Sequence, residues 1–136
     1  MRCLVFALAL LVSAKSRPML AGSEVAATVT KAGVPFYPPL ARAAFVQGVV
    51  VAEVTTSGEA FRAIKILSGH PLLSTAVTEN LRTWVLVNSP AATFKVTYRY
   101  KIADSCKGRP SVTMELPTNV SICSPPSPPM YQRGGS

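Results

Sequence analysis

The sequence contains few side chains that could do chemistry, and their spacing argues against an enzyme. His70 is the only histidine, and it lies between Gly69 and Pro71, where capping a following helix suits it better than catalysis. The six acidic residues show no paired spacing that would suit general acid–base work. Ser68 lacks the G-x-S-x-G context of a nucleophile elbow, and no glycine-rich phosphate loop is present. We therefore predict that the protein is not an enzyme and uses no cofactor and no small-molecule substrate.

The N-terminal residues have the order of a targeting signal. Met1-Arg2 is a short basic start, Cys3–Val12 is an unbroken apolar run, and Ser13-Ala14 supplies small residues. This is the layout of a secretory signal peptide, because the apolar run is shorter than the ~20 residues that cross a bilayer. We predict a signal peptide over 1–14 and a periplasmic or secreted protein. The alternative is a retained N-terminal anchor in the inner membrane.

Export would leave an even number of cysteines, because removal of the signal peptide takes Cys3 with it. We predict that Cys106 and Cys123 then form a disulfide. The closed loop would stabilise the fold by about 3 kcal/mol in the chain-entropy model. Two free buried thiols are the alternative. A metal site is disfavoured, because two cysteines and one distant histidine are too few ligands.

Composition indicates one small, basic, folded domain. The 136 residues suffice for a single core, and 49% hydrophobic against 15% charged residues is the reverse of a disordered composition. The net charge of +8 favours anionic partners. The cations are scattered, however, and no signature of nucleic-acid binding occurs. We therefore expect no nucleic-acid partner.

The segment Phe94–Ile102 alternates between apolar and polar residues, which is typical of a strand with one buried and one wet face. A further strand is predicted over 111–116, and Pro117 interrupts the extended path before 120–122. The proline-rich segment 124–136 is expected to form a mobile tail. In the alternating strand, the residues facing the core are Phe94, Val96, Tyr98, Tyr100 and Ile102, and those facing solvent are Lys95, Thr97, Arg99 and Lys101.

Two helices and a hairpin are predicted before this strand. β-branched runs at 49–56 and 60–67 flank a short turn in which Gly58 can take positive φ, so they indicate a β-hairpin. A short helix is predicted over 37–45 and a longer one after Pro71. The predicted apolar stripes are Leu40, Ala44 and Phe45 on the first helix, and Leu73, Ala76, Val77, Leu81 and Trp84 on the second.

An ordered set of short motifs resembles the C-terminal domain of TonB. The family pattern runs through Tyr-Pro, Ala-Arg, Gly-x-Val, a glycine turn and Ser-Gly, and it ends on a tryptophan after an apolar helix. The resemblance covers residues 37–102, about half of the chain. The matching residues are Tyr37-Pro38, Ala41-Arg42, Gly48-Val49-Val50, Gly58, Ser68-Gly69 and Trp84.

The resemblance implies an α+β fold with a small antiparallel sheet of three to four strands and two helices packed on one face. The domain would cover 36–123 and include an extra C-terminal strand, after a lead of 15–35. Two departures of the sequence from the family pattern bear on this expected fold and on the role that it implies. Ser74 stands where the family often has Asp, and the chain lacks the long proline-rich spacer that precedes the domain in TonB. The second departure puts the energy-transducing role of TonB in doubt.

The resemblance also implies a binding mode, in which an edge strand pairs with an extended segment of an outer-membrane transporter or another envelope protein. The extra strand that follows could block this edge or move it, and the edge could also pair a homodimer. The alternative function is a basic structural envelope protein that binds cell-wall polymer or an anionic lipid surface. The binding edge would comprise Lys95, Val96, Thr97, Tyr98, Arg99, Tyr100 and Lys101.

Overall fold

The computed structural model describes residues 27–87, 91–106 and 110–128. The predicted signal peptide, most of the predicted lead and residues 129–136 of the predicted tail lie outside the described residues. The elements in chain order are β1 (Val29–Lys31), α1 (Pro39–Ala43), β2 (Gly48–Ser57), β3 (Ala60–Ser68), α2 (Pro71–Leu81), β4 (Val85–Leu86), β5 (Thr93–Ile102), β6 (Ser111–Glu115) and β7 (Asn119–Ser124).

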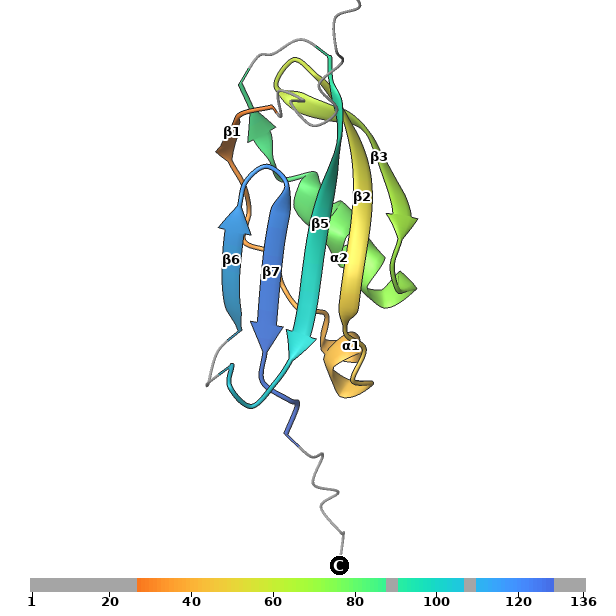
Figure 1. Cartoon of the computed structure of the whole chain (residues 1–136), viewed down its shortest axis with the longest axis vertical. Helices are drawn as coiled ribbons and strands as arrows, with labels where there is room; N and C mark the ends of the chain where they lie inside the picture. The colour runs from red at the N-terminus through yellow and green to blue at the C-terminus, as the bar shows by residue number, and fades with distance from the viewer. Residues whose placement is uncertain (1–26, 88–90, 107–109, 129–136) are drawn as a thin grey trace, which may run out of the picture.

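The main sheet has five strands in the order β3-β2-β5-β7-β6, and a separate two-stranded sheet pairs β1 with β4 (Figure 1). β7 runs parallel to β5, whereas the other pairs are antiparallel. The prediction of an antiparallel sheet of three to four strands is therefore wrong. The reason lies in the C-terminal hairpin: β6 passes along the outside, and β7 returns between β6 and β5 in the direction of β5.

The two helices also differ from the predicted pair on one face. α2 crosses behind the sheet in the view of Figure 1, whereas the five residues of α1 lie at the end of the sheet where β2 begins. α2 begins as predicted, because the Nδ1 atom of His70 accepts a hydrogen bond from the Leu72 amide at 3.2 Å and Pro71 occupies the first turn. Among the described residues, no helix is long and apolar enough to cross a membrane.

The β2–β3 hairpin is confirmed, and its turn is built as the sequence suggests. Gly58 has a φ of 68°, a conformation that residues with a Cβ atom rarely adopt. Gly69, with a φ of 136°, is equally constrained, because a Cβ atom there would lie 2.7 Å from Val50 Cγ2. These two glycines therefore let the chain turn at both ends of β3.

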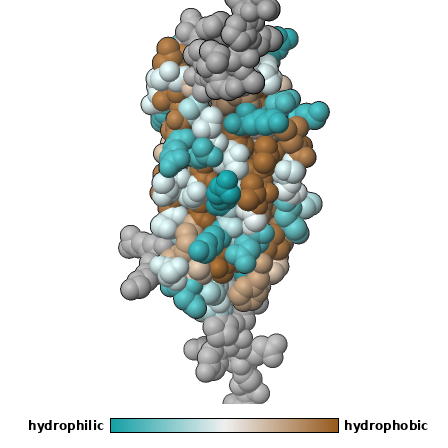
Figure 2. All heavy atoms as spheres, viewed as in Figure 1, coloured by the Kyte–Doolittle hydropathy of each residue, from teal (hydrophilic) through white to brown (hydrophobic). Residues whose placement is uncertain are grey.

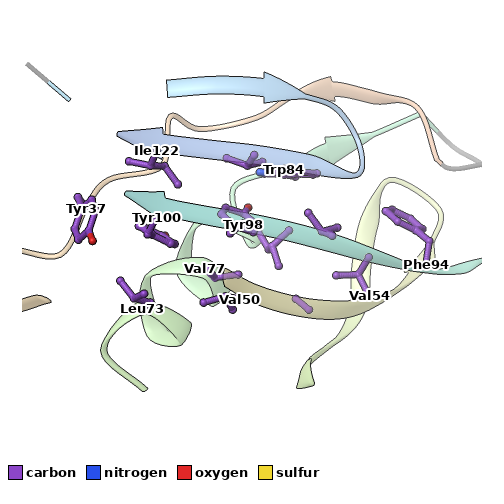
Figure 3. Packing of buried hydrophobic residues seen from close by; sticks show 14 of the residues in the cluster. Tyr37, Val50, Val54, Leu73, Val77, Trp84, Phe94, Tyr98, Tyr100 and Ile122 are labelled. Carbon is purple, nitrogen blue, oxygen red and sulfur yellow. The ribbon is translucent and has the colours of Figure 1, made fainter. Parts of the chain in front are cut away.

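The core lies between α2 and the sheet, and it contains the side chains that the alternating patterns assigned to it (Figure 3). Trp84 is buried as predicted, although it follows α2 instead of ending it. Ala27 is buried as well, and β1 pairs with β4, so part of the predicted lead belongs to the folded domain. The buried residues of the predicted helix stripe and alternating strand are Leu73, Ala76, Val77, Leu81, Trp84, Phe94, Val96, Tyr98 and Tyr100.

Two buried tyrosines in β5 offer a matched test of the core. The Tyr98 hydroxyl donates to Asn80 Oδ1 at 2.7 Å, whereas the Tyr100 hydroxyl is buried without a partner among the described residues. Burial raises the pKa of both phenols, so both are neutral at neutral pH. Tyr98→Phe is expected to lower the free energy of unfolding by about 1–2 kcal/mol, and Tyr100→Phe to leave it unchanged or raise it, because removing an unpaired buried hydroxyl removes a desolvation cost. Urea titration of both variants measures the difference, and equal losses would refute it.

Candidate binding surfaces

The predicted binding edge is not an edge. β5 pairs with β2 along its length, from Gly48 opposite Tyr100 to Thr55 opposite Thr93. On its other flank, β7 pairs with it from Thr97 to Ile102. β5 is therefore paired on both sides from Thr97 to Tyr100, and the prediction that Phe94–Ile102 offers a free edge along its length is wrong.

The predicted site residues also point to opposite faces of the sheet. Val96, Tyr98 and Tyr100 are buried in the core, so their side chains cannot contact a partner. The side chains of Lys95, Thr97, Arg99 and Lys101 lie on the other face, which neither α1 nor α2 covers. The structure therefore keeps the predicted cations together, but on an open sheet face and not along a strand edge.

The predicted disulfide is confirmed between Cys106 and Cys123, with Cα atoms 5.7 Å apart. Cys106 is buried in the turn after β5, and Cys123 lies in β7 opposite Lys101 of β5. The bond therefore ties β7 to the end of the strand beside which it runs. This covalent tie and the buried side chains of Val120 and Ile122 hold the covering strand in place.

Two strands form the edges of the main sheet, β3 on one side and β6 on the other. β3 has nine residues and pairs only with β2 among the described residues. The turn before it is joined to β4, because the Leu86 amide donates to the Glu59 carbonyl at 2.8 Å. β6 has five residues and, again among the residues that the structure describes, pairs only with β7. β3 is therefore the longer free edge.

The side chains of β3 combine apolar anchoring with positive charge. Phe61, Ile64 and Ile66 are half-buried against the core, so they fix the strand on its inner face. Arg62 and Lys65 are exposed, and they are the charged residues of this strand. An extended segment that added to β3 would therefore meet two cations beside a row of backbone hydrogen-bonding groups.

A shallow hollow lies on the open face of the sheet, over β5, β7 and β6. The strand register places Arg99, Ser121 and Thr113 in one row across the three strands, and Lys101, Cys123 and Ser111 in the next. These side chains line the hollow, whose volume is about 220 Å³. Figure 2 views this face, where hydrophilic residues are interspersed with hydrophobic ones. The hollow thus offers two cations and three hydroxyl groups to a small anion.

Sequence reasoning missed both surfaces. For the β3 edge a signal was available, because Arg62 and Lys65 interrupt a run that is otherwise apolar. For the hollow there was none, since it depends on which strand pairs with β5, and Asn119–Ser124 carries no indication of its partner. No protein-family model matches this sequence, and no curated protein matches it either.

Proposed function

We propose that this chain is a protein-binding module of the bacterial cell envelope, and that it binds an extended segment of a transporter or another envelope protein by adding it to the edge of β3. The observation that carries the proposal is the free edge of this nine-residue strand. Its outward N–H and C=O groups, which have no strand partner among the described residues, form a ladder to which another polypeptide can add. The proposal keeps the predicted mode of binding and moves it from β5 to β3.

The β3 edge suits a partner better than the β6 edge does. A strand of nine residues offers a longer ladder than one of five. β3 also contacts α2, and its Ile64 and Ile66 side chains pack against the core. A firmly held strand loses little conformational entropy when it binds, which favours affinity.

The charges of β3 favour an acidic partner over a second copy of the chain. Antiparallel pairing of two β3 strands would bring Arg62 and Lys65 of one copy near those of the other, and like charges on facing strands are destabilising. An extended segment with carboxylates at alternating positions would meet them favourably. The charge therefore argues for a heterologous acidic segment.

The envelope location is supported by the disulfide, because such bonds persist in oxidising compartments. Mass spectrometry of the protein recovered from the producing cell tests it. A mature chain that begins at Lys15 is the expected result, and a chain that retains residues 1–14 would contradict export with cleavage.

Amide hydrogen exchange on the full chain tests the binding edge directly. The probes are two ten-residue peptides, one alternating valine with glutamate and the other alternating valine with lysine. The acidic peptide is expected to slow exchange of the outward amides of Ala60–Ser68 and to bind more tightly. Lys65→Glu is expected to weaken its binding by about fivefold, because an exposed ion pair contributes up to about 1 kcal/mol.

The matched control changes a charge on the opposite edge. Glu115→Lys adds positive charge to β6 and should leave protection of β3 unchanged. Protection that appears on β6 and not on β3, or identical protection by both peptides, would overturn the assignment.

A further inference from the structure

The end of the molecule at α1 exposes apolar side chains that the sequence assigned to the core. Leu40 is 65% exposed and Phe45 64% exposed, although both belong to the predicted apolar stripe of the first helix. Ala41 is the residue of α1 that is buried instead. The predicted stripe is wrong because a helix of five residues is too short for its pattern to show which side faces the sheet.

Phe45 is held in an unusual conformation. Its φ is 54°, and among the described residues it is the non-glycine residue with positive φ. The conformation closes the helix, because the Val46 amide donates to the Ala41 carbonyl at 2.8 Å and the Phe45 amide to the Arg42 carbonyl at 3.1 Å. This is the Schellman arrangement, in which glycine is the usual residue at the position of Phe45. A bulky aromatic residue here is strained, so the exposed ring has a cost in stability that packing does not offset.

Cations lie at the same end of the molecule. The strands β5 and β7 end there, close to the start of β2 and to α1 (Figure 1). Val49, which is 43% exposed, lies directly opposite Arg99 in the sheet register. Lys101 follows two residues later on the same face, and both cations line the hollow with Ser111, Thr113 and Ser121. Exposed Val49 therefore lies beside one of the two cations that line the hollow, and α1 is at the same end of the molecule.

We propose that this end of the molecule binds the surface of an anionic phospholipid membrane, with Phe45 and Leu40 inserted among the acyl chains and a lipid phosphate held in the hollow by Arg99 and Lys101. This goes beyond the proposed protein binding and does not depend on β3. The hollow, at about 220 Å³, is below the usual range for organic ligands of ~300–1,000 Å³. It suits the oxyanion of a headgroup, to which guanidinium, ammonium and hydroxyl groups all donate.

Charge and shape favour a membrane over a protein partner at this end. The chain carries a net charge of +8, and the segment 37–52, which includes α1 and the start of β2, contains Arg42 but no acidic residue. The turn after β5 contains the acidic residue Asp104, but the charge of this end of the molecule stays positive because of Arg42, Arg99 and Lys101. A few apolar side chains on a short turn, flanked by cations, suit shallow insertion into an anionic interface.

Vesicle cosedimentation with the full chain tests the cationic half of the proposal. Vesicles of phosphatidylglycerol and phosphatidylcholine are compared with vesicles of phosphatidylcholine alone, which isolates the part of the binding that depends on anionic lipid. Arg99→Gln with Lys101→Gln is expected to weaken binding to the anionic vesicles by about 30-fold. Arg62→Gln with Lys65→Gln removes the same charge at the β3 edge and should have a much smaller effect. Equal losses in both pairs would mean non-specific attraction and would overturn the site.

Phe45→Gly tests the apolar half, with a readout that a purely structural role would not give. Glycine relieves the backbone strain, so the Tm is expected to rise by about 4 °C. Binding to the anionic vesicles is expected to weaken by about tenfold, because the inserted ring is lost. A higher Tm with unchanged vesicle binding would overturn the insertion.

Inorganic phosphate separates a lipid headgroup from a free anion. Amide chemical shifts of Arg99 and Lys101 are followed while millimolar phosphate is added, and vesicle binding is measured in the same buffer at constant ionic strength. Strong vesicle binding that persists in phosphate supports the lipid. Saturable binding of phosphate that abolishes vesicle binding would overturn it and identify a site for the free anion.

Discussion

Replacing Asn80 by alanine is expected to lower the free energy of unfolding by about 3 kcal/mol, because two buried donors would lose the one acceptor that they have in the described part of the chain. Asn80 Oδ1 accepts from Trp84 Nε1 at 3.1 Å and from the Tyr98 hydroxyl at 2.7 Å. Its Nδ2 donates to the Gly33 carbonyl at 2.8 Å. This amide therefore joins α2, the segment after it, the central strand β5 and the segment before α1. Urea unfolding followed by circular dichroism measures the loss.

A neighbouring residue on the same helix supplies the control. Glu79 is exposed, and Glu79→Ala should change the free energy of unfolding by no more than about 0.5 kcal/mol. A loss at Asn80 as small as that at Glu79 would show that the network contributes little.

Asn80→Asp separates the acceptor role of this side chain from its donor role. An aspartate can still accept from Trp84 and Tyr98, but as a carboxylate it cannot donate to the Gly33 carbonyl. Burial disfavours the charged form and raises the folded-state pKa of the new carboxyl above its unfolded value of about 3.9. The protonated form regains a donor, so the deficit relative to wild type should be largest near neutral pH and should shrink as the pH falls through the folded-state pKa. A deficit independent of pH would contradict the donor role.

The residue pattern of α2 indicates that Asn80 is buried, although its polar side chain alone would suggest exposure. Asn80 follows Ala76 by four residues and Val77 by three, so it lies on the buried stripe that also contains Leu73 and Leu81. A polar residue at a core position of a helix normally has hydrogen-bond partners. The sequence could therefore have indicated a buried network, although it could not have named Tyr98 or Gly33 as the partners.

Local patterns predicted the elements well, and non-local pairing accounts for most of the errors. The β2–β3 hairpin depends on two adjacent runs and the turn at Gly58, and the alternation in β5 depends on ten consecutive residues. Which strand flanks β5, however, depends on the path of the chain through β6 and its return as β7. Nothing within Asn119–Ser124 distinguishes parallel pairing with β5 from a free extended segment, so the free edge was assigned to the wrong strand.

The TonB resemblance stays a prediction, and the structure narrows what it could mean. The elements from α1 to β5 follow in the predicted order of helix, strand, strand, helix and strand, with the two-residue β4 added. The flank of β5 that the resemblance assigned to a partner holds β7 of the same chain. A binding role therefore has to use another surface, which is why the free edge of β3 carries the proposed function.

Loss of the disulfide is expected to lower the free energy of unfolding by about as much as Asn80→Ala does, about 3 kcal/mol. The effect should be concentrated in the C-terminal hairpin of β6 and β7. Cys106 and Cys123 lie 17 positions apart in the sequence, and closing a loop of this length stabilises a fold by about 3 kcal/mol in the chain-entropy model. Cys106→Ser with Cys123→Ser should lower the free energy of unfolding by about that amount. Hydrogen exchange should accelerate most in β6 and β7, because these strands lie between the two cysteines or contain one of them.

Reduction of the wild-type protein checks this result without a change in side-chain volume. Urea unfolding in the presence of dithiothreitol is expected to shift the wild-type curve towards that of the double variant, and the double variant itself should not respond to the reductant. Faster exchange spread evenly over β2, β3 and β7 would mean that the bond stabilises the domain as a whole. Faster exchange confined to β6 and β7 would mean that it holds the strand that covers β5. If reduction leaves the urea midpoint of the wild-type protein unchanged, both interpretations are wrong. The packing of Val120 and Ile122 would then be what holds β7 against β5.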